Sequence, residues 1–312
     1  MDCCCCCQSF NSSDRIPLLI CRGGHTVCSR CSGSLNNCPV CRIDCFRDRV
    51  VNDALHDLVK ASRDGHLCPR ILSDHIILED MIAEGGFAII YAAKWSLLPV
   101  AVKLVSLTEK GRLKLQREMN MISNLSHPSI IRVFGISFFH DTVGIVMEKA
   151  SSSLPTPNSL SPLTLRYAKE LCEGVKFLHQ KSVVHGDLKP SKILLVDGHV
   201  RLSGFSNAKH LVNDDVDDDD VSFAVTPKYT SPDQFERSLS TASDIYSLGI
   251  VLYELLTGKE AFKDCTMLEI IKAKMRGTPL LFDKSTPPSL RELITKCVNL
   301  NNELRPKITG NN

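Results

Sequence analysis

The sequence lacks two kinds of apolar segment, and each absence excludes a class of protein. No apolar run approaches the roughly 20 residues that a membrane-spanning helix needs, because charges or glycine interrupt the leucine, isoleucine and valine runs. Met1 leads directly into Asp2 and five cysteines, so the apolar core of a secretory signal is missing too. We therefore expect a protein without a membrane span, in a reducing compartment, cytoplasmic or nuclear.

The sequence also has little net charge. Its formal charge is +2, with 23% charged and 43% hydrophobic residues, which is ordinary for a soluble globular protein. A nucleic-acid partner would favour a strongly basic balance, so we expect none. The length of 312 residues exceeds the usual size of one domain, about 150 residues, and favours at least two.

Cysteine is abundant only at the N-terminus, where 11 of the 15 cysteines lie at or before Cys45. Most of them fall into closely spaced pairs that, together with one histidine, supply eight ligands. Eight such ligands suffice for two tetrahedral zinc ions of structural type. Cys3 and Cys6 have the same spacing as the favoured first pair, so that choice stays open. The predicted ligands are Cys4, Cys7, Cys21, His25, Cys28, Cys31, Cys38 and Cys41.

This ligand order resembles the RING family of zinc fingers. His25 as the fourth ligand, the ending Cys38-Pro39-Val40-Cys41 and the arginine Arg42 directly after it carry the resemblance. It implies a small, metal-stabilised α+β domain over residues 1–46, with the two zinc sites interleaved as a cross-brace. It also implies a ubiquitin ligase that docks a ubiquitin-conjugating enzyme carrying ubiquitin, with Arg42 positioning the ubiquitin. The first and third pairs would bind one zinc, and the second and fourth pairs the other.

The rest of the chain changes character twice. Apolar residues from Val50 to Val59 fit one face of a helix, so we expect a helical linker over residues 47–73. From about Asp74, short β-branched runs alternate with turn residues, as in an antiparallel sheet. Beyond Pro162, helical spacing dominates. The sequence therefore predicts a β-rich lobe followed by a helical lobe.

Four spaced motifs in this second part resemble the protein-kinase family over residues 74–309. They imply a bilobal α+β kinase fold for a domain at 74–312. The resemblance assigns Lys103 and its partner Glu118 to the nucleotide phosphates, Asp187 to the substrate hydroxyl proton, and Lys189 to the transferred phosphate. The motifs are Val100-Ala101-Val102-Lys103, His185-Gly186-Asp187-Leu188-Lys189-Pro190, Thr226-Pro227-Lys228-Tyr229 and Asp244-Ile245-Tyr246-Ser247-Leu248-Gly249.

The sequence departs from the kinase pattern where nucleotide and metal bind. Of the three glycines in the phosphate loop, only the middle one, Gly85, is kept. Lys192 stands where the family has asparagine, and Gly204-Phe205-Ser206 replaces Asp-Phe-Gly, so the main magnesium carboxylate is missing. These departures predict a pseudokinase with weakened nucleotide binding and a doubtful magnesium site, and they leave open whether ATP binds without being turned over. We also expect Asp233 to form a structural pair with Arg305.

A RING followed by a kinase-like domain resembles the plant Keep-on-Going type of ubiquitin ligase. The leading expectation is therefore a ubiquitin ligase whose pseudokinase domain recruits protein substrates or regulates the ligase. Two alternatives remain open: an active ATP-dependent serine/threonine kinase with a RING appendage, and a non-enzymatic RING-pseudokinase scaffold. The chain ends soon after Arg305, where kinase domains usually continue for one more helical segment, so we expect a truncation there. The sequence indicates no oligomeric state.

Overall fold

The computed structural model separates the chain into two compact units. One, here called the sheet unit, comprises Met1–Asn124 and Arg132–Lys149; the other, the helical unit, comprises Leu125–Ile131 and Ala150–Asn312. Each is described by itself. The described residues are 17–19, 26–28, 31, 50–51, 69–85, 88–106, 108–139, 142–155, 160–211, 226–236 and 238–308.

Three short strands precede the kinase-like region. They are β1 (Pro17–Leu19), β2 (Thr26–Cys28) and β3 (Val50–Val51), and they form one antiparallel sheet in the order β2-β1-β3. The expected helical linker is therefore wrong at its start, because Val50 and Val51 pair with Leu19 and Leu18 of β1. Their β-branched side chains favour extended backbone. Residues 52–68 of that predicted linker lie outside the described residues, and near its end Arg70 forms an isolated β-bridge with Ile136.

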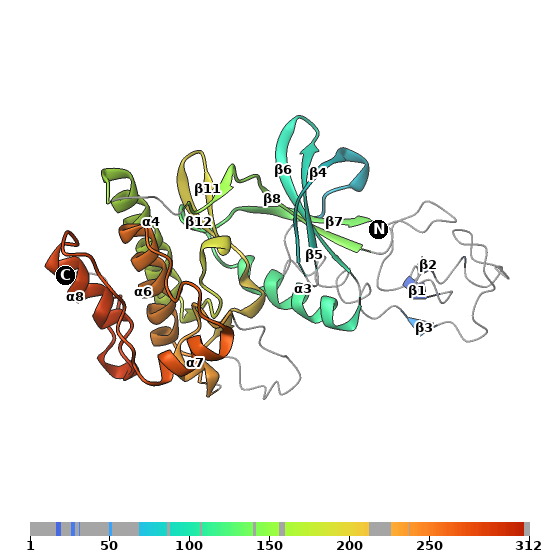
Figure 1. Ribbon diagram of the computed structural model, residues 1–312. Coiled ribbons are helices and arrows are strands. Elements are labelled where there is room, and N and C mark those ends of the chain that lie inside the picture. Colours follow the sequence, from blue (N-terminus) through green and yellow to red (C-terminus); the bar gives the residue numbers. More distant parts are fainter. Residues whose placement is uncertain are drawn as a thin grey trace. The chain divides into compact units, whose positions relative to one another are not determined.

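The sheet unit is built on a five-stranded antiparallel sheet (Figure 1). The β-rich region expected from about Asp74 is thus confirmed. One helix of this unit, α3, contacts β6. In spatial order the strands are β4 (Ile76–Glu84), β5 (Ala88–Trp95), β6 (Leu98–Ser106), β8 (Thr142–Glu148) and β7 (Val133–Phe139), and α3 spans Glu109–Ile122.

The two faces of β6 have different roles. Alternation along a strand sends Val100 and Val102 to one face and Lys103 to the other. Val100 and Val102 are fully buried in an apolar cluster with Ile71, Ala93 and Val146. On α3, Leu115, Glu118, Met119 and Ile122 are buried, which is the spacing of one helical face. The helix thus covers the face of β6 that carries Lys103.

The helical unit has α6 (Thr241–Thr257) at its centre. All of its residues from Ser243 to Leu256 are buried, because α4 and α8 both contact it. The helical region predicted beyond Pro162 is confirmed by α4 and α6. No helix within the described residues is both long and apolar enough to cross a membrane. The other helices are α4 (Pro162–Gln180), α5 (Pro232–Phe235), α7 (Met267–Met275) and α8 (Pro288–Cys297).

Short strands in the helical unit position its polar loops. The hairpin of β11 (Ile193–Val196) and β12 (His199–Leu202) turns at Asp197 and Gly198, both with positive φ. This is the two-residue Asp-Gly turn that suits the twist of a hairpin. Its register pairs Ile193 with Leu202, so the residues just outside the hairpin, Lys192 and Ser203, lie opposite each other. The remaining strands are β9 (Ser152–Ser153), β10 (Val183–Val184) and β13 (Lys209–His210).

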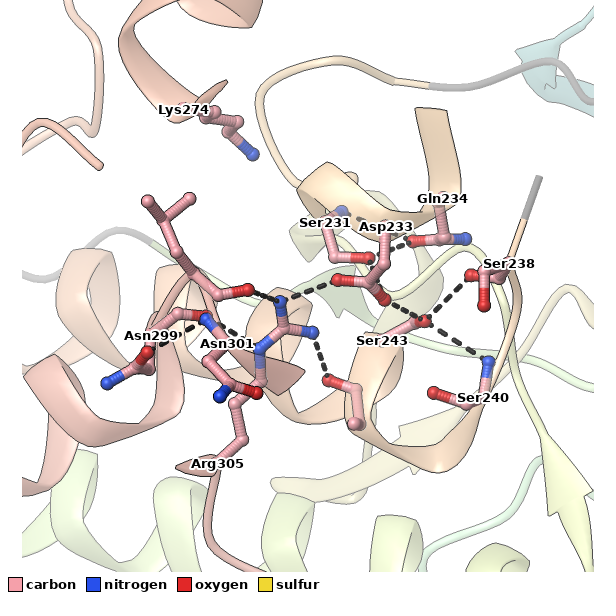
Figure 2. A network of polar contacts seen from close by, with 12 residues as sticks. Ser231, Asp233, Gln234, Ser238, Ser240, Ser243, Lys274, Asn299, Asn301 and Arg305 are labelled. Atoms are coloured by element: carbon pink, nitrogen blue, oxygen red, sulfur yellow. Dashed lines mark hydrogen bonds and ion pairs between the residues drawn. The ribbon is translucent and has the colours of Figure 1, made fainter. Parts of the chain in front are cut away.

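The expected pair of Asp233 and Arg305 is confirmed and lies in a wider polar network (Figure 2). Arg305 Nη2 lies 2.6 Å from Asp233 Oδ1, and the arginine side chain is fully buried. The guanidinium also donates to the carbonyls of Asn299, Ala242 and Leu300. Burial alone would raise the pKa of Asp233, but hydrogen bonds from Arg305 and Ser243 outweigh it and lower that pKa. The network therefore ties α5 and α6 to the C-terminal segment.

We predict that Arg305→Ala strongly destabilises the helical unit. The change leaves the partly buried Asp233 carboxylate without its cation and three carbonyl groups without their donor, and breaking a buried pair from one side costs about 3–5 kcal/mol. Urea unfolding followed by circular dichroism measures this free energy. The control is Lys296→Ala, which breaks an exposed pair with Glu292 and should cost less than about 0.5 kcal/mol. Equal effects for the two variants would contradict this role of Arg305.

Candidate active site

The sheet unit contributes a buried ion pair. Lys103 Nζ on β6 lies 2.5 Å from Glu118 Oε2 on α3, and their side chains are 15% and 7% exposed. Thr108 begins the helix, since its hydroxyl accepts a hydrogen bond from the Gly111 N–H. Both residues expected at the nucleotide phosphates are thus brought together. A paired ammonium held on a central strand is suited to binding phosphate oxygens.

Gly85 lies at the end of β4, in the turn toward β5. Its N–H donates to the Ala88 carbonyl at 2.9 Å. A Cβ at Gly85 would meet only that carbonyl oxygen, at an ordinary 3.6 Å, and its φ is not positive. Neither the backbone nor the neighbours therefore require glycine here. A role in the close approach of a phosphate stays a prediction.

In the helical unit, the catalytic-type loop is anchored by one buried carboxylate. Asp244, in the first turn of α6, is 1% exposed. Its oxygens accept from the N–H groups of His185 at 2.8 Å and Gly186 at 3.0 Å. His179 Nε2 lies 3.1 Å from the same carboxylate. The backbone of the loop is thereby fixed immediately before Asp187.

Asp187 and Lys189 lie together, as expected for a kinase. Lys189 Nζ is 3.0 Å from Asp187 Oδ2, with side chains 20% and 13% exposed. The same ammonium donates to Thr226 Oγ1 at 2.8 Å. A partly exposed carboxylate beside a held ammonium can accept a hydroxyl proton while the cation offsets phosphate charge.

His185 supports this loop as a neutral imidazole. Its side chain is fully buried, and this burial lowers its pKa despite the nearby Asp244 and Asp187. Nε2 lies 3.1 Å from the Ser203 carbonyl oxygen, and Nδ1 lies 3.3 Å from the Asp187 nitrogen. These partners assign the tautomer: Nε2–H donates to the carbonyl, and Nδ1 accepts from the Asp187 N–H. The ring thus links Asp187 to the segment after β12.

The residues at the expected magnesium site do not fit that ion. Kinases hold magnesium with an aspartate and an asparagine, and this chain has Gly204 and Lys192 at those positions. Gly204 has a left-handed backbone, and a Cβ there would lie 2.5 Å from Lys192 Cδ and 2.9 Å from its Nζ. Two unit charges about 4 Å apart interact by about 4 kcal/mol at an effective dielectric of 20, and a divalent ion doubles this. An ammonium here therefore repels magnesium.

The residues predicted for the N-terminal zinc sites lie almost entirely outside the described residues. This holds for Arg42 and for six of the eight ligands; of the other two, Cys28 lies in β2 and Cys31 is partly buried. No cluster of three or more histidine, cysteine, aspartate or glutamate residues that could hold a metal occurs in the described part of the chain. The zinc ligands and Arg42 remain predictions. The six ligands outside are Cys4, Cys7, Cys21, His25, Cys38 and Cys41.

Comparison with known protein families agrees with the geometry described in each of the two units. The model of the protein kinase domain matches residues 77–310, about three quarters of the chain. The chain belongs to the protein kinase family. The bilobal kinase fold inferred from the motifs is thereby supported, with a β-sheet lobe and a helical lobe.

Curated relatives of this protein kinase carry kinase names. The probable serine/threonine-protein kinase gdt4 of Dictyostelium discoideum is 29% identical over 81% of this chain and 16% of its own length. The putative serine/threonine-protein kinase/receptor R831 of Acanthamoeba polyphaga mimivirus is 28% identical over 78% of this chain and 16% of its own length. Human mitogen-activated protein kinase kinase kinase 7 is 26% identical over 75% of this chain and 40% of its own length. The chain thus spans well under half of these relatives.

These comparisons overturn the leading functional expectation. The expectation of a ubiquitin ligase that docks a conjugating enzyme is wrong, because the matched part of the chain is a kinase domain and the matched relatives are named as kinases. The RING resemblance rested on about 40 residues, and its known function was carried over to a chain of 312 residues. The alternative expectation, a serine/threonine kinase, agrees better with these findings.

Sequence reasoning assigned no role to three residues that complete the kinase site. Asp244 and His185 were noticed only as letters of their motifs, because the contacts of Asp244 with the loop span 58 and 59 residues of sequence. Thr226 is 37 residues from Lys189, and nothing local in the sequence indicates their contact. All three hold Asp187 or Lys189 in place.

We predict that His185 makes the kinase less stable in acid. The unfolded imidazole takes up a proton below about pH 6.5, while the folded ring, with its lowered pKa, stays neutral. The free energy of unfolding therefore falls as the pH drops from 7 to 5. His185→Gln removes the titrating group and should reduce that loss by roughly 1–2 kcal/mol. Urea unfolding at both pH values measures it.

The control for this prediction is His75→Gln. The His75 side chain is exposed, so its replacement should leave the loss of stability between pH 7 and 5 unchanged. If His185→Gln loses as much stability as the parent over that range, His185 is not held neutral in the folded protein.

Proposed function

We propose that this chain is an ATP-dependent kinase that phosphorylates serine or threonine hydroxyls of protein substrates. The observation that carries the proposal is the contact of Asp187 with Lys189 on a loop anchored by Asp244, where Lys189 also donates to Thr226. The kinase names of the relatives support the same reaction class. Because the chain spans only part of those relatives, the substrates are inferred from this chemistry.

In the proposed reaction, Lys103 holds the phosphates of ATP. Glu118 is buried against it at 2.5 Å, so the ammonium is oriented before the nucleotide arrives. A preoriented cation stabilises charge on the phosphates without a cost of reorganisation at the moment of reaction. Lys103 thus serves binding and positioning.

Asp187 would act on the substrate hydroxyl. The hydroxyl oxygen forms a bond to the terminal phosphorus of ATP while the bond from that phosphorus to the bridging oxygen breaks. ADP leaves with the bonding electrons, and the hydroxyl proton passes to Asp187. Lys189, 3.0 Å from Asp187, offsets the charge of the transferred phosphate. The chain lacks the aspartate and the asparagine that hold magnesium in kinases, so this description assigns roles only to the residues that are present.

A second candidate function is ATP binding without phosphate transfer. Gly204 in place of the metal-binding aspartate favours it, since phosphoryl transfer depends heavily on neutralising the developing charge. The two functions share the phosphate contacts of Lys103 and differ at Asp187. A transfer assay therefore separates them.

We predict that the chain transfers labelled phosphate from ATP to casein or to itself, and that Asp187→Asn lowers the rate by at least about 100-fold. ATP-induced thermal stabilisation should persist in that variant, because Asp187 acts on the hydroxyl. The matched control is Asp264→Asn, an exposed aspartate with positive φ, which asparagine also tolerates. Stabilisation by ATP without any transfer would favour the second candidate.

We further propose that the N-terminal cysteine pairs bind two structural zinc ions. The support is their spacing alone, with four ligands per tetrahedral ion. Zinc analysis of the purified chain by mass spectrometry should give two ions per chain, and Cys38→Ser should hold fewer. A zinc-free chain that unfolds at the parent temperature would contradict the proposal, because zinc and folding are coupled in such small modules.

A further inference from the structure

Lys192 fills the space that a metal-binding side chain would occupy at position 204. A Cβ placed on Gly204 would lie 2.9 Å from Lys192 Cε and 2.9 Å from Lys192 Nζ. Contacts under 3.0 Å are essentially absent between real atoms of this kind. The lysine can lie there only because residue 204 has no side chain. The two departures from the kinase pattern are therefore one local arrangement.

The β11–β12 hairpin fixes this arrangement. The Ser203 N–H and hydroxyl both donate to the Lys192 carbonyl, at 2.9 Å and 3.0 Å. Gly204 follows with φ 78 and ψ 56, a left-handed conformation that suits glycine. The backbone at 192 is thus held against the segment 203–204, and the lysine side chain extends across Gly204.

The charge balance of this half-site is unusual for a kinase. Asp187, Lys189 and Lys192 together carry a formal charge of +1. The family arrangement has two aspartates and one lysine, which give −1, and one bound magnesium brings it to +1. These three side chains, counted without any metal, therefore have the formal charge of a kinase site with one magnesium. They reach that charge with an ammonium held by the protein.

We propose that the Lys192 ammonium takes the place of a magnesium ion, so that this chain binds ATP as the metal-free nucleotide. The inference rests on the proposed function only for its nucleotide, ATP. The ligand of the Lys192 ammonium is a nucleoside triphosphate, whose phosphate oxygens accept hydrogen bonds from Lys192 Nζ. Charge-assisted hydrogen bonds of this kind are short and strong. A lysine adds one charge and three donors but no octahedral geometry, so it replaces the charge of the metal and not its full chemistry.

The test is isothermal titration with ATP, once in excess EDTA and once in excess MgCl₂. The parent chain should bind ATP in EDTA at least as tightly as in magnesium. Lys192→Gln should weaken binding in EDTA by roughly tenfold or more, the size expected for one lost charge-assisted bond. Lys192→Arg should retain binding in EDTA, because the positive charge is kept.

Two further variants complete the design. Lys272→Gln removes an exposed lysine on α7 and should leave ATP binding in EDTA unchanged. Lys192→Asn combined with Gly204→Asp restores the family residues, and aspartate tolerates the left-handed backbone better than most side chains. This double variant should bind ATP only with magnesium. Thermal unfolding of each variant shows that it is folded.

Three results would overturn the inference: ATP binding by the parent only in magnesium, no ATP binding in either condition, or no loss for Lys192→Gln in EDTA. Phosphate transfer is a separate readout. ATP binding in EDTA, with no phosphate transfer in either EDTA or magnesium, would reject the kinase function and leave the role of Lys192 standing. Transfer that requires magnesium, with binding that also requires it, would reject the role of Lys192 and leave the kinase function standing.

Discussion

The loop that carries Asp187 depends on the hydrogen bonds that the buried carboxylate of Asp244 accepts. This carboxylate accepts hydrogen bonds from the backbone N–H groups of His185 and Gly186. A buried carboxylate with such hydrogen bonds is both stabilised and immobile. The next residue is Asp187, whose own N–H donates a hydrogen bond to Nδ1 of the His185 ring. The position of the proposed base is therefore set from the core outward. Gly186 between them has positive φ, and a Cβ there would press on the Asn207 carbonyl.

The same loop explains why two substitutions at the metal site belong together. An aspartate at position 204 would place its side chain in the space that the Lys192 side chain occupies. Glycine at 204 removes that conflict and also removes a negative charge. The outcome is a half-site in which a protein cation stands where the family places a metal. Such a site keeps the electrostatic attraction for phosphates and loses the geometry that magnesium imposes.

The sequence predicted those parts of the site that local patterns determine. Lys103 ends a β-branched run and Glu118 lies on an amphipathic stretch, so the strand and the helix could be inferred from residue type and spacing. Their pairing was implied by the resemblance to kinases. The sequence predicts a helix at Val50 and Val51, although they lie in a strand, because a short apolar run fits both the helical and the strand periodicity. The contact of Lys189 with Thr226 and that of Lys192 with Gly204 depend on chain crossings and hairpin register. Such features arise from tertiary structure, which no local pattern encodes.

The most direct measurement is a crystal structure of the chain grown with a non-hydrolysable ATP analogue and excess magnesium. Our account predicts Lys192 Nζ within hydrogen-bonding distance of a phosphate oxygen, about 2.7–2.9 Å, and no metal ion beside Gly204. An octahedral ion with oxygen ligands at about 2.1 Å, with the Lys192 side chain turned away from the phosphates, would contradict it.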